Sequence, residues 1–145
     1  MKKVISCLFV LSALACASSP NAANEPAVTA QLADVHFSGD VHFANQIAVQ
    51  FRVQVTNSTA ETVHLRKVEL HTAATGAFGV RVTNNYDVAI PAGQSTVVEL
   101  SATGQSVGGR FAPEEPVMFR GSAYIDTPGG SFVKMFESAV RPADQ

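Results

Sequence analysis

The stretch Ile47-Ala48-Val49-Gln50-Phe51-Arg52-Val53-Gln54-Val55 decides the fold of this chain. Its apolar residues occupy every second position, and the positions between them are polar or small. Because side chains of a β-strand point alternately to opposite faces, the pattern predicts a strand with one buried face and one face in water. We expect the strand to end in the turn-forming sequence that starts at Asn57.

The next segment, residues 63–71, predicts a second strand with a bulge. Val63 and Leu65 share one phase of the alternation, whereas the next two apolar residues share the other. One extra residue near Arg66 and Lys67 would bring all four apolar side chains to the core. Because bulges are common at sheet edges, the sequence favours an edge position, where the bulge would protect the strand from further pairing.

Short alternating segments separated by turns make up the rest of the chain, and no stretch of ten residues carries a helical apolar stripe. Strands with turns every 8–12 residues are typical of β-sandwiches. We therefore expect an all-β protein, a single immunoglobulin-like or fibronectin-III-like β-sandwich of seven or eight strands. The further segments are 35–37 and 41–43 around Ser38-Gly39-Asp40, 78–82 ahead of Asn84-Asn85, 96–102, 117–125 and 132–136.

The N-terminal residues have the features of a secretory signal. Lys2 and Lys3 precede an apolar run at residues 4–14, and small residues lead from this run to Cys16. The run is too short to cross a bilayer, which needs about 20 residues. We expect residues 1–15 to be removed as a signal peptide.

Cys16 is the candidate lipid-attachment residue. Residues 12–16, Ser-Ala-Leu-Ala-Cys, resemble a bacterial lipobox, in which a diacylglycerol is attached to the cysteine before cleavage makes that cysteine the N-terminus. Ala13 stands where the lipobox usually has leucine, and Ala13-Leu14-Ala15 is also an A-x-A site for ordinary signal peptidase. Cleavage by that enzyme would give a soluble periplasmic protein, so both products stay open.

Residues 16–31 combine the cysteine with a small, polar, proline-containing segment that predicts a flexible spacer. A spacer of this kind suits a domain anchored by lipid. Because Ala17 follows the cysteine, the lipobox resemblance implies the outer membrane, with the domain facing the periplasm. The sandwich is expected over residues 32–141, with a short tail at 142–145.

The charge of the chain excludes several partners. Without residues 1–15 it has eight Lys and Arg against twelve Asp and Glu, a net charge of −4, with no cluster of either sign. This composition argues against nucleic acid and against binding to anionic lipid by charge. Cys7 leaves with the signal, so the domain has no cysteine and must fold on its hydrophobic core.

Three parts of the sequence together resemble a known family. They are residues 47–55 ending at Asn57, Val68-Glu69-Leu70, and Ile90-Pro91-Ala92-Gly93-Gln94-Ser95-Thr96 followed by Val-Val-Glu-Leu. They are similar to the LEA14-like domain, also called the water stress and hypersensitive response domain, over roughly residues 32–140. The family usually has Asn-Pro after the first of these strands, whereas Ser58 follows Asn57 here. The resemblance implies a fibronectin-III-like or immunoglobulin-like sandwich, no assigned catalysis, and an envelope or stress-protective role.

One segment matches a catalytic motif. Gly104-Gln105-Ser106-Val107-Gly108 fits G-x-S-x-G, which in hydrolases presents a nucleophilic serine on a strand-to-helix turn. The triad of those enzymes needs a histidine after the serine, and no histidine follows His71. We therefore expect Ser106 to lie in a loop between strands, and the protein not to be an enzyme.

The four histidines raise metal binding as the alternative function, since periplasmic proteins handle copper and zinc. The apolar neighbours of His36, His42 and His64 predict imidazoles that point outward. If residues 35–37 and 41–43 pair as a hairpin, His36 and His42 become neighbours, which gives a surface site of at most two donors. Our main expectation needs no cofactor or metal: an exported, non-enzymatic envelope lipoprotein whose sandwich binds an envelope protein partner or protects against stress.

Overall fold

The computed structural model describes residues 27–38, 46–73, 78–106 and 115–142. These residues contain no helix able to span a membrane. The strands are β1 (Val28–Ser38), β2 (Gln46–Asn57), β3 (Val63–Thr72), β4 (Phe78–Gly79), β5 (Arg81–Ile90), β6 (Ser95–Ser106), β7 (Val117–Thr127) and β8 (Gly130–Val140).

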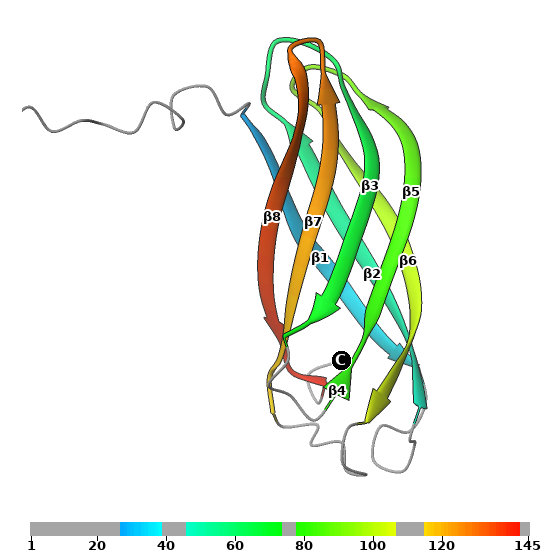
Figure 1. Cartoon of the computed structure of the whole chain (residues 1–145). Coiled ribbons are helices and arrows are strands. Elements are labelled where there is room, and N and C mark those ends of the chain that lie inside the picture. The colour runs from blue at the N-terminus through cyan, green and yellow to red at the C-terminus, as the bar shows by residue number, and fades with distance from the viewer. Residues whose placement is uncertain (1–26, 39–45, 74–77, 107–114, 143–145) are drawn as a thin grey trace, which may run out of the picture.

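The strands form two antiparallel sheets that pack face to face (Figure 1). One sheet has the order β1-β2-β6-β4, and the other has the order β5-β3-β7-β8. The expected all-β sandwich is confirmed, with the number of strands at the upper end of the expected range. Its first strand begins earlier than residue 32, because residues 28–32 already pair with β2.

The core lies between the two sheets and follows the predicted alternation. All five apolar residues of the stretch 47–55 are buried, and the residues between them are exposed or half-buried. Phe51 of β2 meets Phe119 of β7 edge to face, with ring centroids 5.3 Å apart. This contact joins the middle strands of opposite sheets.

The bulge in β3 is confirmed, but its expected place at an edge is wrong. The register of β3 shifts between Leu65 and Lys67 against both of its neighbours. The shift buries all four apolar side chains of this strand, as predicted. Because β5 pairs along one side and β7 along the other, β3 is an inner strand. The bulge therefore protects no edge and instead directs Arg66 outward.

The segment around Asn84-Asn85 also differs from the expectation of a strand that ends there. Phe78–Gly79 belongs to one sheet as β4, whereas β5 runs in the other sheet from Arg81 to Ile90 without a turn. Tyr86 and Val88 pack against the core on the same side as the residues before them. This continued apolar phase outweighs the turn preference of the two asparagines.

Two local arrangements hold the sandwich together. Asn57 is completely buried, and its side-chain amide donates to the carbonyls of Glu61, Ile90 and Pro91 at 2.8, 2.9 and 3.1 Å. These bonds tie the β2–β3 turn to the β5–β6 turn. On β7, Gly121 lies under the ring of Phe136 from β8, and any Cβ at this position would overlap that ring.

Candidate functional site

The outer faces of the two sheets differ in chemistry. The face of β1-β2-β6 carries mainly amide and hydroxyl side chains, with Arg52 and Glu99 as a loose ion pair at 3.8 Å. The face of β5-β3-β7-β8 carries closer ion pairs and large exposed apolar side chains, with Met135 exposed by 76% and Val133 by 43%. We call the latter the charged face; its outward residues include Arg66, Lys67, Glu69, Asp87, Arg120, Tyr124, Asp126, Ser131, Val133, Met135 and Glu137.

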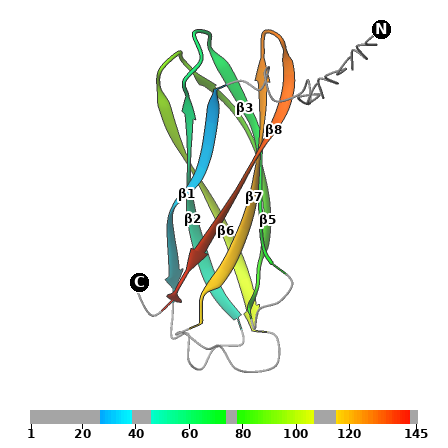
Figure 2. The same cartoon turned by 90° about the vertical axis from the view of Figure 1, so that its left-hand side faces the viewer.

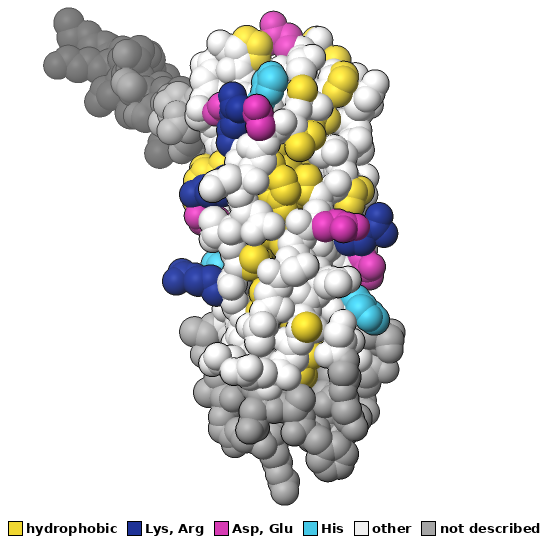
Figure 3. Space-filling view, turned by 90° about the vertical axis from the view of Figure 1, so that its right-hand side faces the viewer, with side chains coloured by type: hydrophobic (Ala, Val, Ile, Leu, Met, Phe, Trp, Pro, Cys, Tyr) yellow, Lys and Arg dark blue, Asp and Glu magenta, His cyan; other side chains and the backbone are white. Residues whose placement is uncertain are grey.

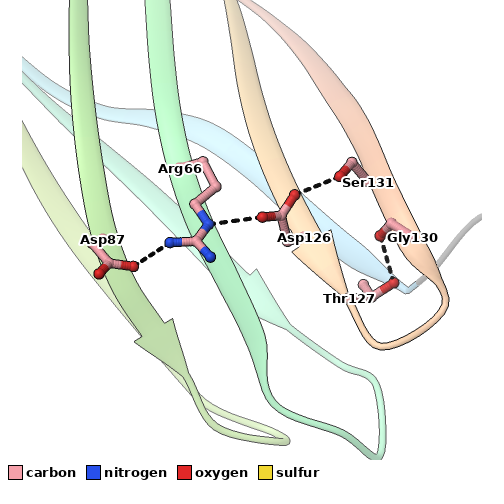
Figure 4. A network of polar contacts seen from close by, with 6 residues as sticks. All are labelled: Arg66, Asp87, Asp126, Thr127, Gly130 and Ser131. Atoms are coloured by element: carbon pink, nitrogen blue, oxygen red, sulfur yellow. Dashed lines mark hydrogen bonds and ion pairs between the residues drawn. The ribbon is translucent and has the colours of Figure 1, made fainter.

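Arg66 is the centre of a polar network on the charged face (Figure 4). Its Nε donates to Oδ2 of Asp126 at 2.7 Å, and its Nη1 pairs with Oδ1 of Asp87. The other oxygen of Asp126 accepts a hydrogen bond of 2.6 Å from Ser131. The network centred on Arg66 therefore links all four strands of the sheet.

These contacts fix the ionised state of the network. The hydrogen bond from Ser131 and then that from Arg66 lower the pKa of Asp126 below its ordinary value. The hydrogen bond to Asp126 raises the pKa of Arg66, and the charge of Asp87 adds to the effect. Because all these groups are well exposed to water, the network orders side chains more than it stabilises the fold.

A second cluster adjoins the first on β3 and β7. Lys67 Nζ lies 2.7 Å from Oε1 of Glu69 and 3.8 Å from the centre of the Tyr124 ring. The Tyr124 hydroxyl donates to Oε2 of Glu69 at 2.9 Å. The hydrogen bonds from Lys67 and Tyr124 lower the pKa of Glu69. Tyr124 is thereby held flat beneath a cation, in the arrangement expected of a cation–π contact.

Between the two clusters the charged face is hollowed by about 490 Å³. Paired charges from both clusters surround an aromatic and aliphatic floor. The hollow can thus receive an apolar side chain, because the charged groups around it already form ion pairs and hydrogen bonds with one another. It is lined by Arg66, Lys67, Asn85, Tyr124, Ile125, Asp126, Ser131, Phe132 and Val133.

The histidines of the described residues are divided between the two sheets. His36 lies on β1 opposite Gln50 of β2, whereas His64 and His71 lie on β3 in the other sheet. Residues 35–37 pair with β2, and His42, which the expected hairpin would place beside His36, lies outside the described residues. Within the described ranges no three His, Cys, Asp or Glu side chains could hold a metal ion. Nothing here supports the metal-handling alternative.

The other predicted site residues are Ser106, which ends a described range, and Cys16, which lies outside the described residues. Ser106 is the last residue of β6 and pairs with Phe78, so it belongs to a strand rather than to the expected loop. The other half of its motif, residues 107 and 108, lies outside the described residues, as does Cys16. The sequence interpretation missed Asp87, Asp126 and Ser131, whose proximity to Arg66 depends on strand order.

No family model and no curated protein matches this chain. Among solved structures, AT1g01470 from Arabidopsis thaliana matches with a TM-score of 0.55 at 12% identity, over 80% of each chain. A protein named as a late embryogenesis abundant (LEA) protein, At2g46140.1, matches with a TM-score of 0.52 at 14% identity, over 83% of this chain and 73% of that one. A protein of Bacillus subtilis named as a lipoprotein, ycdA, has a TM-score of 0.51 at 12% identity, over 81% of this chain and 37% of its own. At these identities the chain is similar to all three in its β-sandwich fold.

Proposed function

We propose that this chain is a non-enzymatic binding module of the bacterial cell envelope, and that it recognises a protein partner through the charged face. The observation that carries the proposal is the gathering of ion pairs, exposed apolar side chains and the 490 Å³ hollow on one of two otherwise similar sheets. Protein interfaces combine an apolar centre with a polar rim in this way. Among the described residues of the opposite sheet, Val97 is the one large apolar side chain that is exposed, and the hollow on that sheet is smaller, about 110 Å³.

The pairing of the charged groups supports a binding role over catalysis. A general acid or base must exchange a proton with its substrate near neutral pH. The hydrogen bonds to Asp126 and Glu69 lower the pKa of both carboxyls, which keeps them ionised and weakly basic. Such groups suit recognition, because they remain charged and oriented while a partner binds.

The N-terminal sequence supports the location. Residues 1–15 have the features of a secretory signal, and Cys16 can receive a lipid. The backbone carbonyl of Ala27 accepts a hydrogen bond from Ser58, so the spacer reaches the sandwich at the end that carries the β2–β3 turn. In Figure 1 the β7–β8 turn lies at this same end. We place the module on the periplasmic side of the outer membrane, and a stress-protective task is one use of such a module.

A site-specific crosslinking experiment tests the charged face. A photoreactive amino acid replaces Asn85, which borders the hollow, and in a matched control it replaces Gln50, which is exposed on the opposite sheet. Irradiation in intact cells is expected to give a discrete protein adduct from position 85 and none from position 50. The same adduct should disappear when Tyr124→Ala removes the floor of the hollow. Equal adducts from both positions, or none from position 85, would contradict the proposal.

A further inference from the structure

Strand β8 pairs with β7 along one side, and along its other side it pairs with no strand of the described residues. The hydrogen-bonding groups of this free edge can be assigned residue by residue. The amide of Ala73 donates to the carbonyl of Met118 at 2.8 Å, so Met118 turns its backbone groups toward β3. In an antiparallel strand the N–H and C=O of one residue point the same way. Met118 therefore does not use these groups to bond its β8 partner, Ala139, which in turn directs its own groups away from β7.

The same direction holds along the whole of β8. Its pairing with β7 runs without a register shift from Val117↔Val140 to Thr127↔Gly130. Every second residue before Ala139 therefore also directs its backbone N–H and C=O to the free side: Glu137, Met135, Val133 and Ser131. The side chains of these residues lie on the charged face, and two of them, Met135 and Val133, are large exposed apolar groups.

The other sheet edges are obstructed. The register of β1 shifts between Leu32 and Asp34, and such a bulge breaks regular pairing. The edges of β5 and β6 are bridged by Tyr86, whose hydroxyl donates to the carbonyl of Glu99 at 2.7 Å. Figure 3 shows this side of the molecule, where apolar side chains fill a stripe between flanking charged groups. Strand β8 pairs with β7 along its whole length without a register shift, so its free edge is regular.

The free edge of β8 continues into a groove. Strands β1 and β8 are the edge strands of the two sheets on the side of the molecule that Figure 2 shows. A groove of about 280 Å³ lies between residues 32–35 of β1 and residues 138–140 of β8 with the following Arg141. Its walls are thus the edges of two sheets. An extended chain that pairs with residues 131–137 would continue into this groove.

We propose that the β8 edge binds an extended peptide strand of another protein, which adds a fifth strand to the sheet and places apolar side chains at alternate positions against Val133 and Met135. A row of outward N–H and C=O groups at every second residue is matched only by another extended backbone. Ser131, Phe132 and Val133 also line the hollow, so the edge is continuous with the charged face. The inference rests on the proposed function and names the class of partner.

The occupant is a foreign strand rather than a second copy of this chain. Lys134 is half-buried on the inner side of β8, opposite Ala123. Two β8 strands paired antiparallel around Met135 would place their Lys134 side chains at diagonal positions on one side of the joined sheet. An inward-pointing charge on an edge strand is a known protection against edge-to-edge pairing of identical chains.

The probe for this inference is an acetylated and amidated nonapeptide of alternating Thr and Val with a lysine at each end. Its residues favour extended structure and carry apolar groups at every second position. Amide hydrogen exchange of the full chain is measured by NMR with and without the peptide. Saturating peptide should slow exchange at least about tenfold at Val133, Met135 and Glu137. Phe132 and Phe136, whose amides already pair with β7, should change little.

Two variants of Met135 separate the contribution of its backbone N–H to peptide binding from that of its side chain. Met135→Pro removes an N–H that β7 does not use, and proline is tolerated at such edge positions. Met135→Ala keeps this N–H and removes only the side chain. Binding should be lost in the proline variant and weakened in the alanine variant. If the proline variant does not fold, the same peptide N-methylated at every residue replaces it, and this peptide should not bind because neither of its edges can donate to β8.

Three results would overturn strand addition. The first is an equal slowing of amide exchange at successive residues of β8. The second is unchanged binding of the N-methylated peptide. The third is a sedimentation result showing that the chain pairs with itself through β8. Failure of the wider proposal has a different signature. If crosslinks from position 85 persist in Met135→Pro while the nonapeptide fails to bind the unaltered chain, the charged face binds a partner without strand addition. If those crosslinks are absent and the nonapeptide binds, the edge is used and the hollow is not.

Discussion

The guanidinium of Arg66 donates to the carboxylate of Asp126 at 2.7 Å, although 60 positions of sequence separate the two residues. The contact forms because the β3 bulge turns Arg66 to the outer face, where Asp87 holds the other side of the guanidinium. The charged face is therefore organised around a cation that contacts two acids from neighbouring strands.

Replacing Arg66 tests this organisation. Arg66→Met leaves Asp87 and Asp126 as like charges on either side of an apolar residue, so the urea midpoint should fall. Arg120→Met is the matched control, because Arg120 contacts one acid, Glu137, at 2.7 Å. The fall should be larger for Arg66 in low salt, and the difference should shrink in 1 M salt, where exposed charges are screened. Equal midpoints for the two variants would contradict the central role of Arg66.

The carboxyls of the charged face predict a loss of stability in acid. Folding lowers the pKa of Asp126 and of Glu69 below the ordinary values of 3.8 and 4.5. A carboxyl whose pKa is lowered by folding stabilises the protein above its unfolded pKa, and this contribution disappears as pH falls through its folded pKa. The urea midpoint should therefore decline from about pH 5 downward. Asp126→Asn should flatten this decline, and an unchanged pH profile would exclude Asp126 as a source.

Asn57 should be among the residues most sensitive to substitution. Asn57→Ala leaves the carbonyls of Glu61, Ile90 and Pro91 without their common donor, and buried unsatisfied groups are costly. We expect unfolding free energy to fall by about 3 kcal/mol. Gln54→Ala, which removes an exposed side-chain contact of 3.4 Å, should change it by less than about 0.5 kcal/mol. Similar urea midpoints for the two variants would refute this role of Asn57.

Gly121 and Phe136 should be energetically coupled. Gly121→Ala forces a methyl group into the ring of Phe136, and we expect a loss of about 2 kcal/mol. Phe136→Leu removes part of that ring and leaves space for the methyl group. The double variant should therefore lose less stability than the two single variants together. Strict additivity in a double-mutant cycle would show that the overlap relaxes elsewhere.

Cys16 decides the mode of attachment. With Cys16→Ser, palmitate labelling should disappear and the protein should leave the membrane fraction, because no thiol remains to carry the lipid. Ser12→Ala, a nearby change outside the cysteine, should leave labelling unchanged. If the unaltered chain takes up no palmitate and its mass fits cleavage alone, ordinary signal peptidase releases a soluble periplasmic protein.

The parts of the structure set by local pattern were predictable, and those set by strand order were not. The alternation in residues 47–55 identified β2 and its buried side, and the change of phase after Leu65 located the bulge. The inner position of β3 was missed, because a bulge is visible in one strand whereas an edge is a property of the sheet. Asp87 and Asp126 were missed for the same reason. The outward charge at the bulge was the available signal, since an arginine there can pair with acids on the neighbouring strands.

The hydrogen bonds of Asn57 have a consequence for where recognition can occur. One amide holds two of the turns at this end of the sandwich, β2–β3 and β5–β6, by their backbone carbonyls, so the lengths and conformations of these two turns cannot vary independently. Antibody variable domains do the opposite, because they diversify loops at one end over a constant framework. Because these turns are fixed in this way, sequence variation that changes what the domain binds must lie on the surfaces of its sheets. Changes in specificity among related chains should therefore appear as side-chain substitutions on strands rather than as insertions in these turns.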